Sequence, residues 1–407
     1  MKTAIVIGGG PAGLIASYFR AINGEKVVLI EKNEKLGKKL YITGKGRCNV
    51  TNDCDEREFL ENVVTNPKFL TGAIYKFSPR KFEEFLGKKI PLKTERGNRV
   101  FPLSDKASDV TKCLESYCDE AGVEIRLNEK VITVNAENGV VTGVTTDKGV
   151  YKAESVIVCT GGLGYPSTGS TGDGYKFAKS AGHKIVNPVP ALCGFNLKGD
   201  DYKSLQGISL KNVTFSAAVN GKNAYTGFGE LLFTHFGISG PLVISASSYL
   251  NRADLKTVEF TIDLKPALTD EQLDARILRD FEKYGGRAVK NSLDDLLLKA
   301  LIPICLKAAK INDEVKNSVL TREERKKLVA TIKNLKFYPA STRDISEAIV
   351  TSGGVGVREI NPSTMESKLV KGLYFAGEVL DVDALTGGFN VTIAACTGYV
   401  AGNATKE

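Results

Sequence analysis

The chain has 407 residues, of which 42% are hydrophobic and 25% charged, so it is long enough for two or three domains with sizeable cores. No apolar run approaches the roughly 18 residues of a membrane helix, and eight scattered cysteines with only two histidines argue against a zinc site or a disulfide framework. We therefore expect a cytoplasmic protein that spans no membrane and binds no metal, and its net charge of +8 mildly favours anionic partners.

The first residues predict a turn that binds a dinucleotide. Residues 4–7 form an apolar run typical of a buried parallel strand, and residues 12–23 predict a helix. Between them, Gly8 permits a tight turn, Gly10 lets the backbone approach a pyrophosphate, and Gly13 lets the helix lie close to the strand. The N-terminal amides and positive dipole end of the helix would face the phosphates. A tight turn without a ligand is the alternative.

An acidic residue stands where a dinucleotide-binding fold uses one. Residues 26–30 predict the second strand, and Glu31 follows it, eighteen residues after Gly13. A carboxylate at this place can accept hydrogen bonds from both ribose hydroxyls, which fits an adenosine without a 2′-phosphate.

Cationic, helical and extended segments follow. Residues 35–52 interleave three glycines with cations, which suggests a loop around a phosphate or a flavin's ribityl chain; a basic surface loop is the alternative. Residues 57–86 predict helical structure, and residues 93–102 predict an extended stretch that carries Arg96 and Arg99.

The predicted parallel sheet then resumes. Residues 123–127 predict a further strand, and three alternating segments up to residue 152 predict an antiparallel meander with Asn138-Gly139 as a hairpin turn. The next buried strand, 156–159, ends at Thr160 and Gly161. In two-dinucleotide-fold flavoproteins, a strand of this kind leads the chain back to the cofactor. The glycine-rich stretch 164–174 is expected to fold over the cofactor or the substrate.

The pattern changes near residue 190, which predicts an insertion. Many short strands precede a helical block whose first helix is capped by Thr269. We expect four segments: a first part of the cofactor domain at 1–190, a β-rich insert at 191–265, a helical insert at 266–340, and a second part of the cofactor domain at 341–407. The cluster Arg322, Arg325, Lys326 and Lys327 in the helical insert is either a solvated helix face or a nucleic-acid footprint.

The last segment predicts a second cofactor contact. A strand over 372–378 leads to Asp381, and a glycine pair, Gly387-Gly388, opens an apolar helix that reaches about residue 401. Asp381 could bind a ribityl hydroxyl, while the positive end of the helix would stabilise negative charge near N1 of a reduced flavin.

Several long motifs in the right order resemble the BaiN/RdsA family of bacterial flavoproteins, whose members include proteins labelled aminoacetone oxidase-like. The matching stretches are GGGPAG, TGKGRCNVTN, TNPKFL, LKTERGNRVFP, TGGLGYPSTGSTGDGY, LLFTHFGISGP, VTSGGV, MESK and GLYFAGEVLDVDALTGGFN. The resemblance covers nearly the whole chain. It implies an α/β fold in which an FAD-binding Rossmann-like domain of the two-dinucleotide-fold type is interrupted by an insert with a β-barrel-like part and a helical part.

The resemblance also implies which residues contact FAD. They are Gly8, Gly10, Gly13, Glu31, Lys39, Gly44, Arg47, Asn49, Gly377, Asp381, Gly388, Phe389 and Asn390. Neighbouring positions in the same segments are expected to join them: Pro11, Ala12, Lys32, Cys48, Thr160, Gly161, Glu378 and Gly387.

Known activities in this family range from bile-acid dienone reduction to the formation of dihydrouridine in ribosomal RNA. Both reduce a carbon–carbon double bond conjugated to a carbonyl, so that the β-carbon accepts hydride from flavin N5 and an acid protonates the α-carbon. Only one glycine fingerprint is evident, so we expect NADH or NADPH and the substrate, a small enone or ribosomal RNA, to visit the same flavin face in turn. The oligomeric state is left open.

Three side chains are candidate proton donors. His235 lies in a glycine-rich stretch of the insert, with a structural histidine as the alternative; His183 is assigned to structure. Cys48 lies near Lys45 and Arg47, which would lower its pKa, with a packing cysteine as the alternative. Tyr165, in the glycine-rich stretch, is a weaker choice.

Two other functions stay open at this point. A flavin amine oxidase is the alternative that the aminoacetone label suggests, and a non-enzymatic flavin-containing RNA-binding protein is a remote one. We expect an enzyme, because a flavin site with this many dedicated contacts normally carries out redox chemistry.

Overall fold

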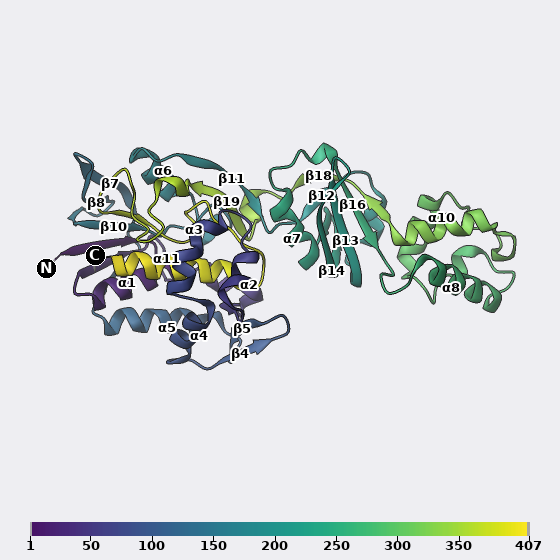
Figure 1. Cartoon of the computed structure of the whole chain (residues 1–407), viewed down its shortest axis with the longest axis horizontal. Coiled ribbons are helices and arrows are strands. Elements are labelled where there is room, and N and C mark those ends of the chain that lie inside the picture. The colour runs from purple at the N-terminus through teal and green to yellow at the C-terminus, as the bar shows by residue number, and fades with distance from the viewer. Residues whose placement is uncertain (1, 405–407) are drawn as a thin grey trace. The chain divides into compact units, whose positions relative to one another are not determined.

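The computed structural model describes residues 2–404. By packing, the chain divides into two compact units, which Figure 1 shows: unit 1, Met1–Ala191 with Asp344–Glu407, and unit 2, Leu192–Arg343. The β-rich and helical parts of the insertion share one hydrophobic core and together form unit 2.

Unit 1 is built on a parallel sheet of the Rossmann type, with strand order β20-β10-β1-β2-β6. The strands are β1 (Thr3–Ile7), β2 (Lys26–Ile30), β6 (Glu124–Arg126), β10 (Ser155–Val158) and β20 (Leu373–Phe375). The apolar residues of β1, β2, β10 and β20 are buried, as expected for parallel strands covered on both faces, and Ile125 of β6 is partly buried. The predicted strands near residues 4–7, 26–30, 123–127 and 156–159 are therefore confirmed.

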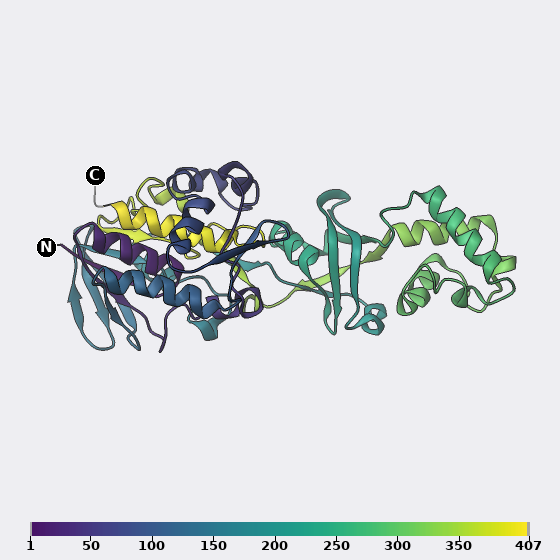
Figure 2. The same cartoon turned by 90° about the horizontal axis from the view of Figure 1, so that it is seen from below.

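Unit 1 also contains α-helices. They are α1 (Pro11–Ile22), α2 (Glu56–Glu61), α3 (Pro67–Lys76), α4 (Pro79–Gly87), α5 (Ala107–Glu120), α6 (Asp173–Ser180) and α11 (Phe389–Asn403). The purple α1 and the yellow α11 lie side by side, as Figure 2 shows, although they come from opposite ends of the chain. The helical segment 57–86 forms three helices because Pro67 and Pro79 each begin a new one.

Smaller antiparallel sheets complete unit 1. One contains β3 (Thr51–Asn52), β4 (Leu92–Glu95) and β5 (Arg99–Pro102); another is the meander of β7 (Val131–Glu137), β8 (Val140–Thr146) and β9 (Val150–Lys152); a third pairs β11 (Ile185–Ala191) with β19 (Val350–Val355). Asn138 and Gly139 both have positive φ, which confirms the predicted hairpin turn of the meander.

Unit 2 contains a seven-stranded antiparallel sheet of order β17-β16-β13-β14-β15-β12-β18. Its strands are β12 (Phe195–Leu197), β13 (Ser209–Val219), β14 (Lys222–Thr234), β15 (Gly237–Ser239), β16 (Val258–Asp263), β17 (Leu335–Phe337) and β18 (Pro339–Thr342). Because Tyr338 alone joins the two edge strands β17 and β18, the sheet must curl so that its edges approach each other.

Four helices complete unit 2: α7 (Pro241–Leu250), α8 (Asp270–Lys283), α9 (Ile302–Ala309) and α10 (Arg322–Lys333). Thr269 caps α8 as expected, in a capping box with Gln272. Within the described part of the chain, no helix is both long enough and apolar enough to cross a membrane.

Candidate functional site

Four of the predicted site segments meet at one edge of the parallel sheet of unit 1. Gly8 follows β1, Glu31 follows β2, Thr160 follows β10, and Gly377 follows β20. These are the carboxyl ends of neighbouring parallel strands, where ligands bind in open α/β folds. The structure thus brings together residues that are up to 369 positions apart in the sequence.

In the glycine turn after β1, the room for a side chain differs from one glycine to the next. Gly8 has a φ of +104°, and a Cβ there would lie 2.5 Å from the carbonyl oxygen of Cys159. A Cβ on Gly13 would lie 1.9 Å from the carbonyl oxygen of Gly8, so the helix and strand pack in direct backbone contact. A Cβ on Gly10 would meet no atom within 4 Å. The open space at the start of α1, next to Pro11 and Ala12, is therefore on the side of Gly10.

The Glu31 carboxylate is buried and organises this turn. Its Oε2 accepts a hydrogen bond from the Gly9 amide at 2.7 Å, and its Oε1 accepts from the amide and side chain of Asn33 at 2.8 and 2.7 Å. Glu31 is therefore held at the end of β2, beside the glycine turn.

Lys32 points to another segment. Its Nζ lies 2.8 Å from Asp173 Oδ2 and also donates to Thr171. Burial by itself would raise the pKa of Asp173, but hydrogen bonds from Lys32, Thr171 and Lys176 lower it to about 2. Lys32 thus anchors the glycine-rich stretch to the end of β2.

An ion pair ties the two sequence parts of unit 1 together. Lys39 Nζ lies 2.8 Å from Glu378 Oε2, and Glu378 Oε1 also accepts from the Thr351 amide at 2.9 Å. The Thr351 hydroxyl accepts from the amides of Leu163 and Gly164, at 2.8 and 3.2 Å. Thr351, which our sequence analysis did not single out, therefore fixes the start of the glycine-rich stretch; its position in VTSGGV was the available sequence feature.

The basic loop around Cys48 differs from its predicted chemistry. Arg47 donates to Asp105 at 2.7 Å and to Glu95, and its guanidinium lies 4.3 Å from the centre of the Phe101 ring. Cys48 is fully buried, and burial raises the pKa of its thiol to about 12. The predicted lowering of this pKa is wrong because the charge of Arg47 is directed to carboxylates and the thiol is removed from water.

The other two proton-donor candidates lie in different units. Tyr165, in unit 1, has a left-handed backbone with a φ of 54°, and its amide donates to Ser346 at 2.9 Å. His235 lies in unit 2, on the exposed turn between β14 and β15, and its ring forms a T-shaped contact with that of Phe236. Both assignments stay predictions.

Two glycines shape the turn that leads into the N-terminus of α11. Gly387 and Gly388 have φ values of 129° and 96°, and a Cβ on Gly388 would lie 2.4 Å from the backbone of Thr51. Phe389 is buried, with its ring centre 5.4 Å from that of Phe59. Asn390 accepts from the Ala384 amide at 3.0 Å and donates back to its carbonyl oxygen at 2.8 Å.

Two asparagines that the sequence analysis did not single out hold this region. Asn66 Nδ2 donates to Asp381 Oδ2 at 3.0 Å. Asn52 Nδ2 donates to the carbonyl oxygens of Gly97 at 3.1 Å and Gly387 at 3.2 Å. Both lie in quoted motifs, TNPKFL and TGKGRCNVTN, which was the only sequence feature that pointed to them.

The residues present fit FAD. Gly10, with its open side, is the N-cap of α1, where helix amides lack intrahelical partners and favour a pyrophosphate. Asn49 lies in the basic loop, and Thr160 follows β10. Asn49 Oδ1 and Thr160 Oγ1 are both buried without a hydrogen-bond partner among residues 2–404. Buried polar atoms normally have partners, so these two favour a polar ligand that supplies them. The glycines Gly44, Gly161 and Gly377 all have positive φ in the surrounding turns.

Comparison with known proteins decides the family. The profile of the HI0933-like protein Rossmann domain matches residues 2–404. The chain belongs to this family, the BaiN/RdsA family. Its members are FAD-dependent oxidoreductases, so this protein is a flavoprotein oxidoreductase.

Relatives cover almost the entire chain. Ribosomal RNA dihydrouridine synthase of Haemophilus influenzae is 32% identical over 97% of this chain and 96% of its own. The 3-dehydro-bile acid delta(4,6)-reductase of Clostridium scindens is 29% identical over 99% of this chain and 98% of its own. Among solved structures, 3-ketosteroid-delta4-(5alpha)-dehydrogenase of Rhodococcus jostii RHA1 covers 99% of this chain and 96% of its own with a TM-score of 0.55 and 14% identity, which supports the fold.

Proposed function

We propose that this flavoprotein uses NADH or NADPH to reduce a uridine of ribosomal RNA to dihydrouridine. The observation that carries the proposal is the similarity to a ribosomal RNA dihydrouridine synthase over 97% of this chain and 96% of the relative. The charge distribution supports it: unit 2 holds 23 lysines and arginines against 17 aspartates and glutamates, and so carries most of the net charge of +8. A basic unit favours a polyanionic substrate.

The residues of unit 1 have distinct tasks in this proposal. When bound, FAD supplies hydride transfer to the double bond of the uracil ring. The start of α1 and the open side of Gly10 hold the pyrophosphate, and Glu31 orients the adenosine ribose. The start of α11, after Gly388, offers its positive dipole end to the flavin's pyrimidine edge. Asn66 holds Asp381, which would bind a hydroxyl of the ribityl chain.

A small conjugated enone is the second candidate substrate, because a relative of similar identity is named a bile-acid reductase. The same reduction of a double bond beside a carbonyl would take place, but the substrate would carry little or no phosphate. The two candidates are therefore separated by the salt dependence of substrate binding, which is steep for RNA and shallow for an apolar ligand.

Mass analysis of ribosomal RNA from cells with and without the gene tests the proposal. We expect one dihydrouridine to be missing in the deletion strain and to return with the wild-type gene. Restoration by the gene but not by its Glu31→Ala variant would tie the modification to bound FAD. Identical modification in both strains would contradict the proposal and favour the enone.

The oxidase alternative is tested by mixing the purified protein with NADPH without oxygen and then admitting air. If the protein is a reductase, we expect NADPH to bleach the flavin quickly and the flavin colour to return slowly in air. In an amine oxidase, the amine reduces the flavin, and the colour returns fast in air.

We further propose His235 as the proton donor. Substitution of His235 by Gln should then slow reoxidation by RNA but leave flavin reduction by NADPH unchanged.

A further inference from the structure

The hairpin of β4 and β5 places two arginines beside the loop that opens α11. Glu95 pairs with Arg99, so residues 96–98 form its turn, and Arg96 and Arg99 are both exposed. The side-chain amide of Asn52 donates both to Gly97 in this turn and to Gly387. Since one amide nitrogen bridges the two carbonyl oxygens, the arginines lie within a side chain's reach of the segment that we assign to the flavin ring.

Strand β3 and the residue after it also hold the hairpin turn and the start of α11 through further hydrogen bonds. The Asp53 amide donates to the Asn98 carbonyl oxygen at 2.7 Å, which holds the turn against the end of β3. The hydroxyls of Thr51 and Thr392 are 2.8 Å apart, which holds β3 against the first turns of α11. The hairpin turn and the start of α11 are thus parts of one hydrogen-bonded structure.

The other cations around this hairpin are already paired with carboxylates. The pairs are Arg47 with Glu95 and Asp105, Lys93 with Asp105 at 2.7 Å, and Arg80 with Asp53 at 3.7 Å. Arg96 and Arg99 differ: among residues 2–404, no carboxylate lies within ion-pair distance of either. Arg99 Nε donates to the Arg96 carbonyl oxygen at 3.0 Å. Two guanidinium charges therefore stay available to a ligand.

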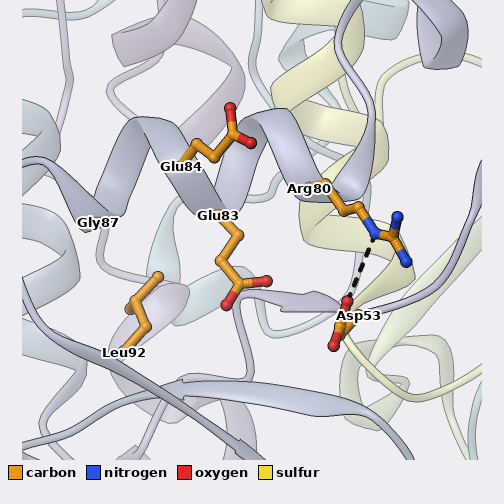
Figure 3. Close-up of a pocket in the computed structure, with 6 residues that line it drawn as sticks. All are labelled: Asp53, Arg80, Glu83, Glu84, Gly87 and Leu92. Atoms are coloured by element: carbon orange, nitrogen blue, oxygen red, sulfur yellow. Dashed lines mark ion pairs between the residues drawn. The ribbon is translucent and has the colours of Figure 1, made fainter.

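The nearby cavity does not suit an anion. It has a volume of about 410 Å³ and lies between α4 and the start of β4, as Figure 3 shows. Its lining residues are Asp53, Arg80, Glu83, Glu84, Gly87 and Leu92. Asp53 pairs with Arg80 there, and burial next to Asp53 raises the pKa of Glu83. An anion near the hairpin is therefore directed to the arginines of the turn.

We propose that Arg96 and Arg99 bind a phosphate group of the molecule that approaches the flavin. The planar guanidinium donates in a fork that matches phosphate oxygens, and two such groups on a fixed turn define a position for the phosphate. This inference rests on the proposed function. The phosphate has two possible sources, the sugar–phosphate backbone of RNA next to the reduced uridine and the phosphates of NADH or NADPH.

The test compares the FAD-loaded wild-type protein with its Arg96→Ala/Arg99→Ala variant. In the first arm, binding of a labelled uridine-rich single-stranded RNA is measured at several salt concentrations. If the phosphate belongs to RNA, we expect binding to weaken about tenfold. The logarithmic salt slope should become shallower by about 1.4, at about 0.7 for each lost contact.

The second arm measures flavin reduction without oxygen at increasing NADH and NADPH. If the phosphate belongs to the dinucleotide, the half-saturating concentration should rise about tenfold. The Arg96→Lys/Arg99→Lys variant, which keeps both charges, should retain most of the binding. The control is Lys148→Ala/Lys152→Ala, which removes the same charge from the exposed side of the meander, away from the hairpin in Figure 1.

Three results would overturn the inference: no change in either arm, an equal change in the lysine control, or loss of FAD from the arginine variant, which would assign the arginines to the cofactor loop itself. A wild-type protein that binds no RNA and leaves ribosomal RNA unmodified would refute the proposed function instead. In that case the dinucleotide arm would still test the arginines.

Discussion

We propose that Glu31, whose buried carboxylate is held beside the glycine turn, contributes strongly to cofactor binding. We predict that Glu31→Ala weakens FAD binding about tenfold to a hundredfold, because hydrogen bonds to a charged group contribute about 1.5–3 kcal/mol. Titration of the apoprotein with FAD measures this. Glu34→Ala, which removes an exposed carboxylate paired with Lys38, is the control. Equal affinity of the Glu31 variant and the wild type would refute the role of Glu31.

Cys48 is expected to be dispensable for proton transfer. Its thiol is buried with a pKa of about 12, so it cannot deliver a proton readily near neutral pH. We predict that Cys48→Ala leaves the rate of flavin reoxidation by RNA within about threefold of the wild-type rate, less than the hundredfold or more that a general acid contributes. Stopped-flow absorbance of the flavin measures this, and a loss of two orders of magnitude would restore Cys48 as a candidate.

Among the structural elements, the turn between β1 and α1 contains two glycines that we expect to affect different properties. Gly10 should matter for cofactor binding and Gly13 for stability. Gly10→Ala should leave the free energy of unfolding within about 0.5 kcal/mol of the wild type and still weaken FAD binding, since its Cβ meets no protein atom. Gly13→Ala should cost about 1–3 kcal/mol of stability, since its Cβ would overlap the Gly8 carbonyl. Denaturant unfolding of both apoproteins checks this, and equal destabilisation would contradict it.

The segment between α6 and β11 should make unit 1 sensitive to acid. His183 is buried between Glu359, at 3.2 Å, and Ser367, at 2.7 Å, and burial lowers its pKa. The unfolded chain therefore binds a proton at a pH where the folded protein does not. His183 therefore does not lower the free energy of unfolding above about pH 6.5. Below that pH the free energy of unfolding falls, by at most about 1.4 kcal/mol per pH unit.

Denaturant unfolding between about pH 7.5 and pH 5 measures this contribution. His183→Gln, which cannot titrate, should flatten the slope in that range. The same slope in the wild type and the variant would show that other groups cause the acid sensitivity.

For the whole molecule, the sequence was most informative where local pattern decides structure. The apolar runs that end at Gly8 and Thr160 predict parallel strands, and a parallel sheet then brings their ends to one edge. Contacts between distant segments could not be predicted in this way. Asn52 reaches Gly387 across 335 positions, and Arg47 turns to Glu95 and Asp105 instead of acidifying Cys48. Such contacts depend on loop geometry, which periodicity does not specify.

We propose that this protein reduces a uridine in ribosomal RNA. A reaction of the purified FAD-loaded protein with NADPH and ribosomal RNA from the deletion strain, followed by mass analysis of the RNA, tests this reduction. We predict that one uridine gains two hydrogens. Flavin that is reduced by NADPH while the RNA stays unchanged, both as free RNA and as ribosomal subunits, would contradict the claim.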